Sequence, residues 1–223
     1  MNARGHHTAE SQDAYSLVAG ATCLDFLNTV GGLRGGQTKE YVRTYTDLVR
    51  WSWQAGLLQT DLVDRLLHDS AACSDEADAV LARAVVLREA LYRLFTRLLD
   101  GVPPAPADLA IFNTELAPAL AHLTLAHSPH EGFVWRWSDT EHALDGVLWP
   151  IARSAAELLL SPSVHALRQC AGETCGWLFL DTTKNHSRRW CEMRACGNRA
   201  KVRRHRARRH PGELASGKTP RSR

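Results

Sequence analysis

Four of the six cysteines lie close together in the C-terminal part of the chain. They form two Cys-x4-Cys pairs, Cys170 with Cys175 and Cys191 with Cys196, which are separated by fifteen residues. A tetrahedral zinc site has this pattern, because each short loop places two thiolates on one ion and the intervening segment folds back. The spacing predicts one structural Zn²⁺ bound by all four thiolates, with no open position for a catalytic water.

Other uses of paired cysteines remain open at this point. Four-residue gaps are wider than the commonest two-residue knuckle, so an iron–sulfur cluster or a redox switch is an alternative. Disulfides are disfavoured, because residues 1–16 are polar and do not resemble a secretion signal. Cys23 and Cys73 are isolated and are expected to be small buried hydrophobic residues.

Charge is distributed unevenly along the chain. Residues 1–183 hold 13 Lys or Arg and 22 Asp or Glu, a net charge of −9, so residues 184–223 carry +12. Between Lys184 and His210, eleven basic residues face the single acid Glu192. Such a block indicates a polyanion partner, since Lys and Arg release counterions when they neutralise phosphates. A solvated basic tail is the alternative interpretation.

Nine cations of this block are candidates for nucleic-acid contacts. Most are expected to bind phosphate and set the register, while Arg199 or Arg203 is placed to read guanine edges. Each single arginine has a solvated side chain as its alternative role. The candidates are Arg188, Arg189, Arg199, Lys201, Arg203, Arg204, Arg206, Arg208 and Arg209.

The segment between the cysteine pairs is predicted to be a hairpin. Gly176–Asp181 has the composition of a strand, residues 182–186 that of a turn, and Ser187–Trp190 that of a returning strand. Trp177 and Trp190 are expected to pack the small core of this module rather than stack on bases.

A basic helix is predicted to follow the last cysteine. Asn198 is expected to cap a helix over Arg199–His210 that ends before Pro211. This helix has almost no apolar face, so we expect it to become fully ordered when it binds the phosphates of a nucleic acid. Knuckle, hairpin, second knuckle and helix follow one another as in a treble-clef or ribbon-like zinc finger.

The preceding part of the chain is predicted to be a mainly α (α+β) body. Its clearest helix spans Asp75–Asp100, where apolar residues recur at spacings of three and four between a Ser74 cap and Gly101. Shorter helices are expected over Thr22–Val30, from a Thr46 cap to Gly56, after a Thr60 cap, and over Ala107–Leu116.

Two further elements complete the predicted body. His122–His127 and Phe133–Trp137 alternate in apolar character across a turn and indicate a small β-hairpin. The helical period then returns from Asp139 to Leu159, with a kink expected at Pro150. No apolar run reaches the roughly 20 residues that cross a bilayer, so no membrane segment is predicted.

Asp25 and Asn28 lie one helical turn apart beside a glycine-rich loop. A cap or a buried hydrogen bond is the expected role, and a ligand pocket is the alternative. We find no Ser/His/Asp signature, phosphate loop or paired carboxylates in a clear context, so no enzymatic activity is predicted.

The C-terminal residues resemble those of a known family, the CGNR zinc finger proteins. Trp190-Cys191 and Cys196–Lys201 are similar to the signature for which that family is named, and Leu178–Asp181 and Arg204–Arg208 also fit it. In that family the finger follows an ABATE domain, which is described as a stress-induced transcription regulator. Leu24–Thr29 resembles the opening motif of that domain.

These observations divide the chain into four parts and favour one class of function. Residues 1–16 are predicted to be a flexible leader, 17–165 an ABATE-like helical domain, 166–212 a CGNR-type finger with its basic helix, and 213–223 a disordered basic tail. We expect a cytoplasmic, zinc-dependent DNA-binding transcription regulator whose body senses a small-molecule effector or forms a homodimer. An RNA-binding or ribosome-associated protein and an enzyme with its pocket in the body are the alternatives.

Overall fold

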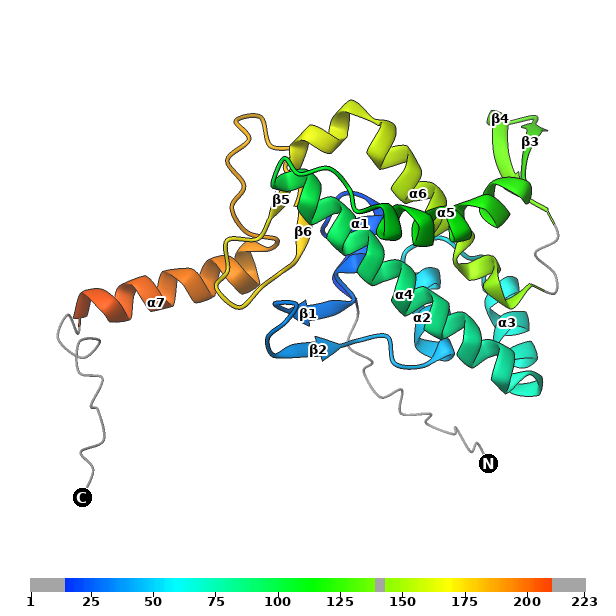
Figure 1. Cartoon of the computed structure of the whole chain (residues 1–223), viewed down its shortest axis with the longest axis horizontal. Coiled ribbons are helices and arrows are strands. Elements are labelled where there is room, and N and C mark those ends of the chain that lie inside the picture. The colour runs from blue at the N-terminus through cyan, green and yellow to red at the C-terminus, as the bar shows by residue number, and fades with distance from the viewer. Residues whose placement is uncertain (1–14, 139–142, 210–223) are drawn as a thin grey trace, which may run out of the picture.

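A computed structural model describes residues 15–138 and 143–209 (Figure 1). Of the predicted leader only Tyr15 and Ser16 fall in this range, and the predicted tail lies outside it. The described residues form a mainly helical fold with three small antiparallel sheets, which confirms the predicted class. The helices and strands are α1 (Thr22–Leu27), β1 (Val30–Gly32), β2 (Thr38–Glu40), α2 (Tyr45–Gln54), α3 (Thr60–Ala72), α4 (Ser74–Leu99), α5 (Pro106–Ala121), β3 (Leu123–Ser128), β4 (Gly132–Trp137), α6 (Trp149–Leu160), β5 (Leu167–Gln169), β6 (Leu178–Leu180) and α7 (Asn198–Arg209).

The long helix α4 runs through the body. Apolar residues three and four apart place Leu87, Leu91 and Phe95 on one fully buried face. Asp75 in the first turn complements the positive end of the helix dipole. Gly101 follows the helix with φ +66°, a left-handed conformation that glycine adopts without strain.

The predicted Thr46 cap is wrong, because Thr44 caps α2. The Thr44 hydroxyl accepts a hydrogen bond from the Asp47 N–H (3.1 Å), and the Asp47 carboxylate accepts one from the Thr44 N–H (3.0 Å). Asp47 completes this capping box only with Thr44, which lies three residues before it. Thr60 and Ser74 are first helical residues rather than caps.

The β3–β4 hairpin is confirmed, but the prediction around Pro150 is wrong. The hairpin pairs Leu125 with Trp135. Pro150 lies in the first turn of α6, behind a separate 3-10 turn over Leu144–Val147, and therefore starts a helix instead of kinking one. Proline is tolerated there because first-turn N–H groups have no helical acceptor.

The predicted finger hairpin has the wrong partner strand. β6 pairs with β5, which precedes the first cysteine, and Ser187–Trp190 is not a strand. The other edge of β6 meets the start of the body, where Leu180 N–H donates to the Ala19 carbonyl (2.7 Å). The glycine-rich loop after α1 forms a hairpin too, β1–β2, which alternation of apolar residues does not indicate.

Buried side chains form two clusters, and the first includes the four clustered cysteines. That cluster joins them to Leu24 of α1, Leu91 of α4 and Phe179 of β6. The second lies around Trp51 of α2, whose ring is 5.3 Å from that of Phe26. The cysteine module therefore has no core of its own, since it shares that of the body.

The basic helix and the β3–β4 hairpin lie at opposite ends of the long axis of the molecule. Figure 1 shows α7 extending away from the body, whereas α1, α4 and α6 pack together. Within the part of the chain that the structure describes, no helix has the length and apolar character needed to cross a membrane.

Candidate metal centre and nucleic-acid interface

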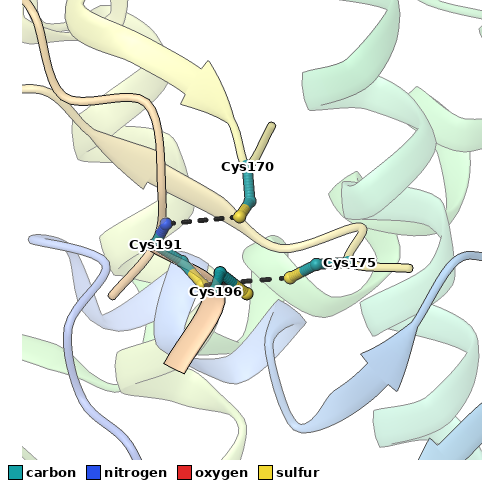
Figure 2. Close-up of side chains that lie close together, drawn as sticks. All are labelled: Cys170, Cys175, Cys191 and Cys196. Carbon is teal, nitrogen blue, oxygen red and sulfur yellow. Dashed lines mark hydrogen bonds between the residues drawn. The ribbon is translucent and has the colours of Figure 1, made fainter. Parts of the chain in front are cut away.

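The four clustered cysteines converge on one point. The sulfurs of Cys170, Cys175, Cys191 and Cys196 all lie within 4.8 Å of one another, and all four side chains are buried (Figure 2). Cys191 Sγ is 3.8 Å from Cys175 Sγ and 3.6 Å from Cys196 Sγ. Tetrahedral zinc with Zn–S distances of about 2.3 Å separates its sulfurs by about 3.8 Å, so this donor set fits the ion.

Each cysteine pair is positioned by a tight turn. Cys170 directly follows β5, and an added Cβ at Gly172 would lie 3.1 Å from Cys175 Cβ and 3.4 Å from Cys196 Sγ. A side chain at this position would crowd the sulfurs, so glycine favours the tight closure of the first loop around them. Cys196 lies in a π-helical turn over Met193–Gly197 that leads directly into α7.

The electrostatics of the cluster favour a bound cation. Hydrogen bonds with the sulfurs of Cys170 and Cys175 raise the pKa of Cys191, and burial and repulsion between neighbouring thiolates act in the same direction. Hydrogen bonds from Cys175 and Cys191 lower the pKa of Cys170. A divalent cation removes the repulsion and lets all four sulfurs ionise.

Two N–H groups also donate hydrogen bonds to the clustered sulfurs. The backbone N–H of Cys191 lies 3.4 Å from Cys170 Sγ, and the guanidinium of Arg199 lies 2.9 Å from Cys196 Sγ. The Cys196 sulfur raises the pKa of Arg199 by accepting this hydrogen bond. Such contacts offset the net negative charge that four thiolates leave on a zinc site.

Comparison with family models gives two matches. Residues 20–162 match ABATE, described as "Putative stress-induced transcription regulator", and residues 166–209 match the CGNR zinc finger. The chain belongs to the ABATE family and carries a CGNR zinc finger. No curated protein matches it. The family and the converging sulfurs together confirm the prediction of one structural zinc ion.

The CGNR finger is fixed to the ABATE domain by hydrogen bonds that are buried or partly buried. The Asn28 amide donates to the Leu178 carbonyl (2.9 Å) and accepts from the Leu178 N–H (3.0 Å), as in a strand pair. Trp177 Nε1 donates to the Val30 carbonyl (2.9 Å), and the Tyr92 hydroxyl donates to the Gly176 carbonyl (3.0 Å). Finger and domain are therefore one packed unit.

Arg188, one of the predicted nucleic-acid contacts, lies inside this unit. Its guanidinium donates to the carbonyls of Val18 (2.8 Å) and Cys191, and its carbon Cζ lies 4.3 Å from the centroid of the Phe179 ring. The carboxylate of Asp181 fixes the preceding loop by accepting the Arg188 N–H (2.9 Å). The structure thus gives Arg188 internal partners, which spacing alone does not reveal.

The remaining candidates are exposed and fall into two groups. Arg189 lies over the Trp190 ring at 5.3 Å, Arg199 contacts Cys196, and Arg203 pairs with Glu173 at 2.7 Å. The other five, which form no ion pair with any residue that the structure describes, are Lys201, Arg204, Arg206, Arg208 and Arg209.

Asn198 is not the predicted cap of α7. It has helical dihedral angles, and its side chain donates back to the Arg194 carbonyl (3.1 Å). The π-helical turn continues into α7, so there is no free helix start to cap. The zinc ligand Cys196 and the basic helix are thus joined without an intervening loop.

The structure places Asp25 and Asn28 in hydrogen bonds and also beside a cavity. Asp25 accepts from the Ala19 N–H (2.9 Å), and both side chains line a cavity of about 120 Å³ between domain and finger, here termed the junction cavity. Sequence periodicity does not indicate that Trp51 of α2 lines the same cavity. Cys23 is buried as predicted, whereas Cys73 is exposed at the end of α3 and that prediction is wrong.

Proposed function

We propose that the protein is a transcription regulator that binds duplex DNA through α7. The observation that supports this most directly is the exposure of the helix: none of its residues is buried, and seven of its twelve are Lys or Arg. An isolated helix of like charges repels itself, so a polyanion is the partner that stabilises it.

The dimensions of α7 favour DNA over duplex RNA. An α-helix with its side chains is about 10–12 Å wide, and the major groove of B-DNA is about 12 Å wide. The major groove of A-form RNA is too deep and narrow for side chains to read. Cations on several faces of a helix in the DNA groove reach the phosphates on both sides of it.

Zinc sets the direction of α7 in this proposal. Cys196 lies in the turn from which the helix starts, so the metal fixes its base against the ABATE domain. We propose binding rather than catalysis, because four thiolates fill the coordination positions of the ion and leave none for a reactive water.

Fluorescence anisotropy with duplex DNA and duplex RNA of one sequence, across a salt series, tests the proposal. The protein should bind DNA more tightly than RNA. Replacing Arg204, Arg206, Arg208 and Arg209 with Gln should weaken DNA binding and lower the salt slope by about 0.9 for each phosphate that is no longer neutralised.

The matched control replaces two exposed cations of the ABATE domain, Arg43→Gln and Arg50→Gln, and should leave the slope unchanged. Equal binding of DNA by the α7 variant and the wild type would contradict the proposal. Tighter binding of duplex RNA than of DNA would assign the helix to RNA instead.

A further inference from the structure

The junction cavity is built by segments far apart in the sequence. Asp25 comes from α1, Tyr41 from the segment before α2, Trp51 from α2, and Trp177 from the loop that follows Cys175. Its volume of about 120 Å³ is close to the roughly 150 Å³ of an engineered protein cavity that binds benzene. The space therefore suits a small molecule rather than a peptide or nucleotide.

Aromatic rings form much of its wall. Tyr15, Tyr41, Trp51 and Trp177 line it, and no Lys or Arg is among its lining residues. The face of an aromatic ring is electron-rich and attracts cations, most strongly when the cation is desolvated. Lys39 already lies 4.7 Å from the centroid of the Tyr41 ring, at the exposed surface.

Asp25 is the acidic group of the cavity, and it forms no ion pair with any residue that the structure describes. Burial raises the pKa of its carboxyl to about 6, although Arg188 acts in the opposite direction. Arg88, which donates to Thr29 on the cavity wall (2.9 Å), is itself paired with Glu40 at 2.5 Å. A half-buried carboxylate without a direct ion pair to any described residue thus faces a ring-lined space.

Trp51 supplies an unused donor. Its side chain is fully buried, and its indole N–H has no hydrogen-bond acceptor among the described residues. A buried donor left without a partner carries a free-energy cost, because it has lost its hydrogen bonds to water. Trp51 is among the residues that line the cavity, so a ligand oxygen that reached its indole N–H would remove that cost.

We propose that the junction cavity binds a small organic ammonium compound that carries an oxygen acceptor. The aromatic rings and Asp25 take the ammonium group, and Trp51 Nε1 donates to the oxygen. Because Trp177 belongs to the finger and Asn28 holds Leu178, such a ligand also stabilises the contact between finger and domain. The site does not depend on whether α7 binds DNA.

Calorimetric titration of the full-length, zinc-loaded protein tests this proposal. Choline is the probe, and 3,3-dimethyl-1-butanol, which has its shape and hydroxyl without its charge, is the comparison. Choline should bind at least about tenfold more tightly than this neutral compound. A factor of ten corresponds to about 1.4 kcal/mol of cation–π and ionic attraction.

Two variants separate the contributions. Asp25→Asn, which keeps an acceptor for the Ala19 N–H, should weaken choline binding by about tenfold and leave the neutral isostere unchanged. Trp51→Phe should weaken the binding of both compounds, since both carry the hydroxyl group that accepts from the indole N–H. Asp61→Asn, which changes an exposed carboxylate of α3, is the matched control and should change neither.

Equal affinity for choline and its neutral isostere would overturn the proposal, because the cavity would then be merely apolar. Absence of binding by choline, ethanolamine and tetramethylammonium at millimolar concentration would overturn it too. Thermal unfolding of each variant confirms that a weaker affinity does not come from a disrupted fold.

Discussion

The cysteine loops and helix α7 are adjacent in sequence but differ in how they are held. The four cysteines are buried and pack in the same cluster as residues of α1, α4 and α6, whereas none of the residues of α7 is buried. Hydrogen bonds such as that of Asn28 to Leu178 fix the former, and α7 contacts the rest of the chain through its first turn and the Arg203–Glu173 ion pair. A rigid metal-bound base thus presents a helix whose partner lies outside the chain.

The zinc finger of this chain differs from an autonomous one. An autonomous finger unfolds alone when its metal is removed. Here the loop around the metal carries Trp177 and leads into Leu178, which both bond to the ABATE domain. Loss of the metal is therefore expected to reach the domain as well.

Removal of one zinc ligand should have the largest effect. Cys191→Ser is expected to lower the free energy of unfolding by on the order of 5 kcal/mol or more, because structural zinc contributes about 10–16 kcal/mol in zinc-finger peptides. Metal analysis and thermal unfolding measure this. Cys73→Ser, at an exposed position, is the control and should retain zinc. An unchanged melting transition of the ABATE domain after zinc loss would show that the two units are independent.

Loss of the Asn28 amide should have the second-largest effect on stability. Asn28→Ala leaves the buried N–H and carbonyl of Leu178 without partners, which is expected to cost about 2–3 kcal/mol in urea unfolding. Asn113→Ala, on the exposed side of α5, should change stability by less than about 0.5 kcal/mol. Similar values for the two variants would mean that the finger is not held by this pair.

Asp25→Asn should stabilise the protein in the absence of ligand. The folded-state pKa of about 6 lies above the ordinary value of 3.8. Stability therefore falls as pH rises from 3.8 to 6, because the carboxyl ionises more readily in the unfolded chain, and the ionised group disfavours folding at every pH above 6. The gain should be on the order of 1 kcal/mol at pH 7.5, allowing for partial exposure, and smaller at pH 5. Urea unfolding at both pH values measures it. A destabilised variant at pH 7.5 would mean that the ionised carboxylate supports the fold.

The smallest effect is expected at the ion pair between the two regions. Glu173→Gln should change stability by less than about 1 kcal/mol, because both side chains are more than half exposed. It should also strengthen DNA binding slightly, since Arg203 is released. Glu157→Gln breaks a partly exposed ion pair on α6, far from α7 in the chain, and should leave DNA binding unchanged, as anisotropy would show. Weaker DNA binding by Glu173→Gln would mean that the pair orients α7.

Elements with local determinants were predicted best from the sequence. The long helix α4 and the β3–β4 hairpin follow from periodicity, because each repeats its own pattern over many residues. Elements with distant partners were missed: β5 has three residues and no alternation to mark it, and Arg188 looks like any other cation of the basic block. The Thr46 cap was wrong because Thr44 and Thr46 are the same residue type two positions apart. The residue three positions ahead, Asp47 for Thr44, decides between them.

By itself, the sequence determined the metal, its four ligands and the charge of the helix that follows them. Thiolate chemistry and short loops decide the first two, and composition decides the third. Only the tertiary structure decided that the finger shares the core of the ABATE domain, and that Tyr41, Trp51 and Trp177 surround one carboxylate. The physical reason is that a cavity is defined by packing between distant segments, and no local pattern in the chain records which side chains that packing leaves facing one another.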